Sequence, residues 1–514
     1  MKISGSLKCL LFAGGLLFSV ALKGQSTGPK WEFRGAWIAT VENVDWPSKP
    51  GLSPGEQRQE FIRLLDTLSA DGINAVIVQI RPSADAMYPS AYEPWSQWLS
   101  GKQGVAPAPY YDPLSFMIGE AHARGMEFHA WFNPYRAVFN LKNPGISPGH
   151  VTRLHPDWFL DYGGRKFFNP GLPQTWDWLV RVVSDVVRRY DIDAVHFDDY
   201  FYPYRIAGKE FPDYQTWKKY GGSLSLEDWR RHNVDTVIQM VSVAIKKIKP
   251  WVKFGISPFG IWRNQDRDPE GSATHGGQTD YDDLYADVLL WLRKGWIDYV
   301  APQLYWEFGN RSAPYGVLLD WWARHSYGRA LYIGHAAYRI GQGSAWADPD
   351  QMGRQIRAER TYPQVEGSVF YSAKYFLSDP LGFTDSLKNH YYRYPALLPP
   401  MPWIDSIPPP APTLSLIRSD SGGVTLGWTE PADTIHPAFQ YLLDRFRPGD
   451  SIGFGDPSHI VALLTEPLPH QYEDTGFHPG DQATYLMTAL DRLHNESLPG
   501  PPLRVGPGKT RSPD

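Results

Sequence analysis

Short apolar segments alternate with longer amphipathic ones over most of this chain of 514 residues. The apolar segments are rich in β-branched and aromatic residues, which is typical of buried parallel strands. Eight of them lie at 33–40, 73–80, 127–132, 192–197, 252–257, 299–306, 330–338 and 367–373. Helical patterns between them lie at 56–72, 114–124, 176–190, 225–248, 281–294 and 350–360.

This alternation predicts an α/β protein with parallel strands. Eight strands over about 360 residues favour a (β/α)8 TIM-type barrel with enlarged loops, which we place at 31–395. A doubly wound open sheet is the alternative. Because no glycine-rich phosphate loop follows the first strand, a nucleotide-binding version of that fold is disfavoured.

The N-terminus carries a targeting signal. Residues 1–25 begin with two lysines and continue with an apolar stretch at 9–22, and small or polar residues follow from Gly24, which predicts a cleaved signal peptide. The apolar stretch is too short for a stable membrane span. Cys9 is the single cysteine, so the mature chain would have no disulfide, cysteine metal ligand or thiol nucleophile. We therefore expect an extracytoplasmic protein.

The pattern changes after the barrel. Residues 396–412 are rich in proline and read as a linker. In 413–507, turns of Gly, Pro and Asp separate short strands at 424–428, 439–446, 459–464 and 484–490. This pattern predicts a small fibronectin type III-like β-sandwich, with Trp428 and Tyr485 as its core and corner aromatic residues. It has no cluster of acids, so we expect a spacer or docking module.

Charge and aromatic content narrow the choice of ligand. With a net charge of −5, the composition does not favour nucleic acid or an anionic membrane as a partner. The chain contains 21 tryptophan, 29 tyrosine and 24 phenylalanine residues. Many of these rings belong to the core, but rings also stack on the apolar faces of sugars. A neutral or mixed-charge polysaccharide therefore suits the composition best.

The segment HFDDYFYPY at 196–204 carries the clearest chemical signal. A buried strand ends abruptly in Asp198 and Asp199, and aromatic residues follow. Paired carboxylates supply the acid, base or nucleophile of glycoside cleavage. Because side chains alternate along a strand, His196 and Asp198 should face the barrel interior. We rank Asp198 first and Asp199 second as catalytic carboxylates; capping a helix or closing a turn is the structural alternative.

Polar and aromatic residues follow nearly every predicted strand. In a (β/α)8 barrel, the active site lies at the carboxyl ends of the strands. We therefore expect the substrate-binding wall to include Arg81, Asn133, Tyr135, Gln303, Tyr305, Trp306 and Tyr371.

Glycoside cleavage normally needs two carboxyl groups, about 5–5.5 Å apart for retention or about 6.5–9.5 Å apart for inversion of configuration. One must stay protonated, and burial near rings would raise its pKa. The candidate partners of Asp198 are Asp199, Glu93 and Glu307. Glu93 and Glu307 follow the second and sixth strands, and either is otherwise a solvated loop acid. Arg81 either binds a carboxylate or holds an acid in place.

Signals for a metal or cofactor are weak. His122 and His129 have no partner at ligand spacing. Asp280, Asp282 and Asp283 lie near a helix start, where carboxylates interact favourably with the helix dipole. No G-x-S-x-G elbow is present, so a serine triad is not supported. We expect neither a metal nor a cofactor.

Six segments, in the order of the expected barrel strands, resemble the bacterial glycosyl hydrolase-like 10 family. They are FRGAWIATVENVDWPS (33–48), GINAVIVQIRPSADAMYPSAYEPWSQWLSGKQG (72–104), AWFNPYR (130–136), DAVHFDDYFYPY (193–204), FGISPFGIWRN (254–264) and DYVAPQLYWEFG (298–309). The resemblance covers nearly all of residues 31–395. The tail is similar to the fibronectin-type module that some members carry.

The resemblance implies a (β/α)8 glycoside hydrolase outside the cytoplasm. A family member in the enteric bacterial envelope acts on peptidoglycan glycan strands stripped of their peptides, which implies a cell-wall glycan as a candidate substrate. Arg34 lies within the first matching segment, and the resemblance implies substrate binding for it.

The favoured hypothesis is a glycoside hydrolase of the bacterial cell envelope that cleaves a polysaccharide by carboxylate acid–base catalysis. A non-catalytic glycan-binding protein on a barrel fold and an envelope scaffold are the alternatives. The patterns leave the sugar, the linkage and the oligomeric state open.

Overall fold

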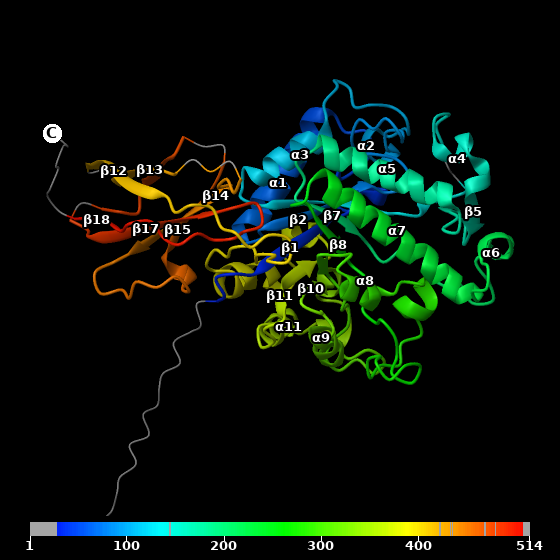
Figure 1. Ribbon diagram of the computed structural model, residues 1–514. Coiled ribbons are helices and arrows are strands. Elements are labelled where there is room, and N and C mark those ends of the chain that lie inside the picture. Colours follow the sequence, from blue (N-terminus) through cyan, green and yellow to red (C-terminus); the bar gives the residue numbers. More distant parts are fainter. Residues whose placement is uncertain are drawn as a thin grey trace, which may run out of the picture.

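The computed structural model describes residues 28–506 except 143–144, 421–422, 432, 434, 467–468 and 479. The predicted signal peptide lies outside the described residues. Eight strands close into a barrel in the order β1-β11-β10-β9-β8-β7-β3-β2 (Figure 1). All neighbouring pairs are parallel. This confirms the barrel and excludes the open sheet.

The barrel strands lie close to the apolar segments of the sequence. They are β1 (Phe33–Ile38), β2 (Ala75–Arg81), β3 (Glu127–Phe132), β7 (Ala194–Phe197), β8 (Lys253–Ile256), β9 (Tyr299–Val300), β10 (Ala330–His335) and β11 (Val365–Phe370). The sixth strand is shorter than predicted, since Pro302 follows it and proline has no N–H to donate to a ladder.

Helices cover the outside of the barrel. The main ones are α1 (Pro54–Ala70), α3 (Pro113–His122), α5 (Pro173–Arg189), α7 (Leu226–Ile248), α8 (Val288–Lys294), α9 (Tyr315–Arg324) and α11 (Gln351–Glu359). The shorter ones are α2 (Gln97–Ser100), α4 (Val151–Leu154), α6 (Tyr214–Tyr220), α10 (Gly343–Trp346), α12 (Lys374–Ser378) and α13 (Phe383–Ser386). The helix expected at 281–294 is interrupted, because Tyr285 adopts a left-handed backbone conformation and Asp287 caps a new helix, α8.

Local signals explain where α1 begins and ends. The Ser53 side chain accepts a hydrogen bond from the Glu56 N–H, and the Glu56 side chain bonds back to the Ser53 N–H, which forms a capping box. Pro54 occupies the first turn, where its missing N–H costs nothing. Gly72, at φ +84°, ends the helix in the left-handed conformation that glycine tolerates.

Side-chain alternation divides the barrel into two layers. Phe33, Trp37, Ile77 and Tyr299 belong to the cluster that fills the interior. Their strand neighbours pack with the helices in the larger outer cluster. Leu398 of the predicted linker joins the inner cluster, so the linker packs against the barrel.

The connection between β3 and α5 contains a small sheet that the sequence patterns did not predict. Its three strands are β4 (Arg136–Val138), β5 (Phe159–Tyr162) and β6 (Arg165–Phe168). They form an antiparallel sheet in the order β4-β6-β5. These strands are too short to give a clear periodic signal.

The C-terminal part is a β-sandwich of two antiparallel sheets. One sheet has the order β12-β13-β16 and the other β15-β14-β17-β18. The strands are β12 (Thr413–Asp420), β13 (Gly423–Thr429), β14 (Gln440–Phe446), β15 (Ile460–Thr465), β16 (Gln471–Asp474), β17 (Ala483–Leu490) and β18 (Leu503–Val505). Trp428 and Tyr485 are buried in it, and the Tyr485 hydroxyl donates to Asp474 Oδ2 at 2.7 Å. The fibronectin type III assignment stays a prediction.

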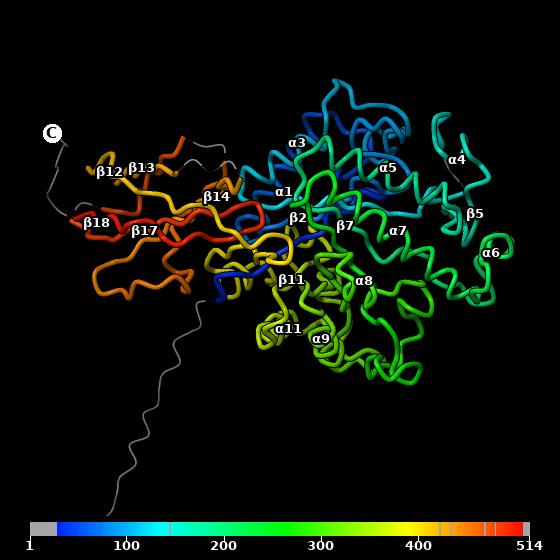
Figure 2. The backbone as a smooth tube through the Cα atoms, in the orientation of Figure 1, coloured from blue at the N-terminus to red at the C-terminus, as the bar shows by residue number. Residues whose placement is uncertain are grey.

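The sandwich lies against the end of the barrel where the strands begin (Figures 1 and 2). Lys30, just before β1, pairs with Glu496 at 2.8 Å. Glu127, the first residue of β3, accepts a hydrogen bond from His494 at 2.7 Å. Arg492 pairs with Asp191 at 2.6 Å. Since the active site of a barrel lies at the opposite end, the sandwich leaves that end open. Among the described residues, no helix is both long and apolar enough to cross a membrane.

We expect Glu127→Gln to lower the free energy of unfolding by about 3–5 kcal/mol, because the buried Lys253 ammonium beside it would lose its counter-ion. Denaturant unfolding followed by tryptophan fluorescence measures the loss. Asp191→Asn removes a half-exposed partner of Arg492 at the same interface and should cost less than about 1 kcal/mol. Equal losses in the two variants would contradict this account.

Candidate active site

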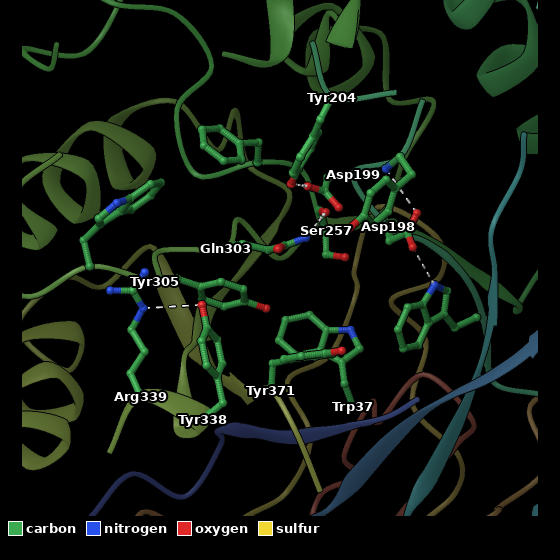
Figure 3. A pocket seen from close by; sticks show the side chains of 14 residues that line it. Trp37, Asp198, Asp199, Tyr204, Ser257, Gln303, Tyr305, Tyr338, Arg339 and Tyr371 are labelled. Carbon is green, nitrogen blue, oxygen red and sulfur yellow. Dashed lines mark hydrogen bonds between the residues drawn. The ribbon is translucent and has the colours of Figure 1, made fainter. Parts of the chain in front are cut away.

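A cavity of about 340 Å³ opens at the carboxyl ends of the barrel strands (Figure 3). Seven of the eight barrel strands, or the loops that follow them, supply described residues to its lining. Strand β2 and the loop after it supply none of the described lining residues. The lining residues are Trp37, Trp131, Asp198, Asp199, Tyr200, Tyr204, Ser257, Phe259, Gln303, Tyr305, Trp306, Tyr338, Arg339 and Tyr371.

Asp198 follows β7 directly and is almost completely buried. Its Oδ2 accepts hydrogen bonds from Trp131 Nε1, at 3.2 Å, and from Asn133 Nδ2. Its Oδ1 accepts from the Tyr200 N–H at 3.2 Å. Three neutral donors therefore hold the carboxyl group at the cavity wall.

Asp199 is the next residue and is equally buried. Its Oδ2 accepts a hydrogen bond from the Tyr204 hydroxyl. Gln303 also faces it, and the Gln303 Nε2 donates to the Ser257 carbonyl at 3.0 Å. In Figure 3 both carboxyl groups lie on the same side of the cavity, between Tyr204 and Trp37.

The two carboxyl groups share one electrostatic environment. Burial and the neighbouring charge of Asp199 raise the pKa of Asp198 to about 7. Burial also raises the pKa of Asp199, to about 6, against the opposing hydrogen bonds of Tyr204 and Gln303. Because the groups interact, their titration belongs to the pair. Between about pH 6 and pH 7 the pair therefore holds about one proton.

Aromatic rings form the opposite wall. The centroids of the Tyr305 and Tyr338 rings are 5.8 Å apart, and that of Tyr371 lies 6.3 Å from Tyr305. Trp306 packs edge-on against Phe259 at 5.5 Å. Rings with exposed faces beside a carboxyl pair provide the surface on which sugar units stack.

The structure brings together six of the predicted site residues. Asp198, Asp199, Gln303, Tyr305, Trp306 and Tyr371 line the cavity. Asn133 lies behind them, donates to Asp198 and accepts from Gln79 Nε2 at 2.5 Å. Its contact with the cavity is therefore indirect, through the carboxyl group that it holds.

Glu93 and Arg81 do not line the cavity. Arg81 Nε donates to Glu93 Oε2 at 2.7 Å, and its second terminal nitrogen lies 2.5 Å from Oε1. Both side chains are fully buried, and Trp178 Nε1 also donates to Glu93 at 3.1 Å. Of the two roles open to Arg81, the structure shows that of holding an acid in place. Glu93, in the loop after β2, is thereby tied to the end of that strand and lies away from the cavity.

Three further predicted residues lie elsewhere. Arg34 points out of the barrel because it alternates with the inward Phe33, and it bonds to Glu32 at 2.8 Å and stacks on Tyr392. Tyr135 is buried in the outer cluster. Glu307 lines a different surface depression and accepts from Asn310 at 3.1 Å. For Tyr135 and Glu307 the unreliable step was the position after a strand end, whereas Arg34, which the resemblance implied, lies near the start of β1.

Eight lining residues were not among the predicted site residues. Trp37 and Trp131 could have been found by strand alternation, since both face inward from barrel strands. Tyr200 and Tyr204 stand in the motif at 196–204, and Ser257 and Tyr338 follow strand ends. Phe259 stands in the matching segment at 254–264, and Arg339 carried no sequence signal.

The described residues contain no group of three or more His, Cys, Asp or Glu side chains placed to hold a metal ion. The chemistry that the cavity offers is that of two coupled carboxyl groups. Asp283, one of the three acids that the sequence places near a helix start, accepts a hydrogen bond from the Thr279 N–H at 2.7 Å.

Residues 32–352 match the sequence profile described as Glycosyl hydrolase-like 10. The chain belongs to this family. Glycosyl hydrolase YngK of Bacillus subtilis (strain 168) is 46% identical over 497 residues, covering 95% of this chain and 96% of that relative. Glycosyl hydrolase DigH of Escherichia coli (strain K12) is 41% identical over 379 residues, covering 68% and 84%. The PgaB (BpsB) glycoside hydrolase domain from Bordetella bronchiseptica covers 70% of this chain and 99% of its own, with 13% identity and a TM-score of 0.46.

We expect Asp198→Asn to become more stable relative to the parent protein as the pH rises. Folding raises the pKa of Asp198 from 3.8 to about 7. Between these pH values the carboxyl group ionises in the unfolded chain but stays protonated in the folded protein, so the parent protein loses stability as the pH rises. Between pH 4 and pH 8 the difference in unfolding free energy should move in favour of the variant by roughly 2–4 kcal/mol. Denaturant titrations at several pH values measure it, and a constant difference would refute the assignment.

Proposed function

We propose that this family member is a glycoside hydrolase that cleaves a polysaccharide by carboxylate acid–base catalysis. One observation carries the proposal: Asp198 and Asp199 are the acids that line the cavity, among the residues described, and aromatic rings face them. The family match and the two relatives named glycosyl hydrolase support the same chemistry.

The environments of the two carboxyl groups divide the roles. Asp198 has the higher pKa, so it holds the shared proton and donates it to the oxygen of the leaving sugar. Asp199 is the anion, and Tyr204 and Gln303 donate hydrogen bonds that favour its charged form. It acts as the base or the nucleophile. Tyr305 and Tyr371 supply stacking faces for the sugar units on either side of the bond.

The substrate that we propose is a glycan of the bacterial cell envelope, with denuded peptidoglycan strands as the first candidate. The apolar segment at 9–22 supports export, and the resemblance of the six barrel segments supports a cell-wall substrate. We also infer that the sandwich is of the fibronectin type III kind. We infer that it supports the barrel at the end where the strands begin, because its ion pairs lie there, opposite the cavity.

Asp198→Asn should abolish glycan cleavage and leave the fold intact, since the amide cannot give up a proton as the acid does. The measurement is product analysis by mass spectrometry after incubation with peptidoglycan, denuded strands and a panel of neutral glycans. Glu307→Gln is the matched control and should keep full activity, because Glu307 does not line the cavity. Full activity of Asp198→Asn ends the assignment, and binding without turnover by the parent protein favours a non-catalytic glycan-binding protein.

The pH dependence of cleavage should be narrow. A pair that works with one proton loses activity when the base is protonated below about pH 6 and when the acid ionises above about pH 7. Initial rates across pH 4–9 should therefore describe a bell whose two apparent pKa values belong to the pair. A rate that stays level through that range is incompatible with this mechanism.

A further inference from the structure

A second cavity, of about 170 Å³, lies on the other side of the barrel rim. Its lining comes from the connections that follow β1, β2 and β3, whereas most of the first cavity lies over the strands from β7 to β11. Since these are the carboxyl ends of parallel strands, both cavities open at the same end of the barrel. The volume far exceeds the roughly 10–15 Å³ that admits one water molecule.

The lining of the second cavity is polar and fixed in position. Asp85 is buried and accepts hydrogen bonds from the Ser83 N–H, at 3.0 Å, and from Gln103 Nε2, at 3.4 Å. The Ser83 hydroxyl and the Trp98 indole N–H are also buried, and neither has a hydrogen-bond partner among the described residues. The cavity is therefore lined by a fixed carboxylate and a fixed amide, and two unpartnered donors lie just beneath its surface.

The backbone around this cavity is strained. Glu42 has φ +53° and Ala84 has φ +50°, and residues with side chains rarely adopt such values. Ala84 stands between Ser83 and Asp85, the two lining residues described above. Backbone strain of this kind is retained where the surrounding contacts hold it in place, and ligand sites are among the places where it is found.

Arg136 connects the two cavities. Its guanidinium carbon lies 5.5 Å from the ring centroid of Tyr200, which lines the first cavity, and 5.4 Å from that of Phe139, which lines the second. Arg136 Nε donates to the Pro82 carbonyl at 2.8 Å, and the side chain is buried. Arg136 therefore lies between a ring of the first cavity and a ring of the second, and packs against both.

The charges of the second cavity select the type of sugar. Carboxyl groups of Glu42 and Asp85 line it, with amides from Gln97, Gln103 and Asn140, and no described basic side chain does so. A carboxylate-bearing sugar would be repelled, whereas hydroxyl and acetamido groups would find acceptors and donors. The Trp98 ring, 6.2 Å from Phe139, adds an aromatic surface.

We propose that this cavity is a remote subsite that binds a neutral sugar unit of the same polysaccharide chain that is cleaved between Asp198 and Asp199. The inference rests on the proposed function. In denuded peptidoglycan, neutral N-acetylglucosamine alternates with N-acetylmuramic acid, which carries a carboxylate. A subsite that admits only the neutral unit would set the register in which such a strand is cut.

Calorimetric titration of the full chain carrying Asp198→Asn tests the subsite without turnover. The probes are the hexamer of N-acetylglucosamine, the disaccharide of the same sugar, which we expect to occupy only the first cavity, and a denuded peptidoglycan hexasaccharide. Adding Trp98→Ala should weaken hexamer binding about tenfold and leave disaccharide binding unchanged. A misfolded variant would lose both.

Charge reversal supplies the second arm. Glu42→Lys changes an exposed lining residue and should raise the affinity for the acidic hexasaccharide relative to the neutral hexamer. Glu227→Lys, an equal charge change on the outer helix α7, should leave that ratio unchanged.

The outcomes separate the subsite from the catalytic function. If the parent protein cleaves glycans, Trp98→Ala leaves hexamer binding unchanged and Glu42→Lys leaves the ratio of the two affinities unchanged, the subsite is overturned and the proposed function stands. If the parent cleaves nothing, but hexamer binding depends on Trp98 and the ratio of the two affinities depends on Glu42, the subsite stands and the hydrolase assignment falls. Absence of hexamer binding overturns the subsite.

Discussion

A buried carboxylate at the start of strand β3, Glu127, joins the sandwich to the barrel. It accepts hydrogen bonds from His494 of the sandwich at 2.7 Å and from His129 at 2.8 Å, and it lies beside the Lys253 ammonium. Burial would raise the pKa of Glu127, but Lys253 and the two histidines together hold it well below its ordinary value. A charge this deep persists only when its partners are complete. The sandwich therefore completes the floor of the barrel, and its position does not depend on a flexible tether.

From His129 the hydrogen bonds continue towards the cavity. His129 Nδ1 lies 2.8 Å from the Tyr299 hydroxyl, and that hydroxyl lies 2.9 Å from His196 Nδ1. Trp37 Nε1, which can only donate, points at His196 Nε2 at 3.3 Å. Burial lowers the pKa of His196, so the ring is neutral and its proton must sit on Nδ1. Tyr299 then donates to His129, and His129 Nε2 donates to Glu127. The Trp37 ring at the cavity is thus oriented by a network that ends at the opposite end of the barrel.

Sequence patterns predicted the barrel well because burial of a parallel strand is a local property of a few consecutive residues. They predicted Asp198 for the same reason, since it follows a buried strand in the inward position. They did not predict that Glu93 is held away from the cavity, because its loop must fold back before Glu93 meets Arg81. The short sheet between β3 and α5, which places Phe139 at the rim, was also not predicted. Its strands pair with one another, and each is too short to show a periodic pattern.

What distinguishes the acids of this molecule is the type of partner that each has. Glu93 and Glu127 are buried in ion pairs with Arg81 and Lys253. Among the described residues, no cation forms an ion pair with Asp198 or Asp199, and the groups that bond to them are amide, indole, phenol and backbone donors. Neutral donors favour the charged form less strongly than a cation does, so they hold a carboxyl group in place and still let it take up a proton. Two such groups side by side compete for one proton, so the pair can donate it and take it back, which an ion-paired acid cannot do.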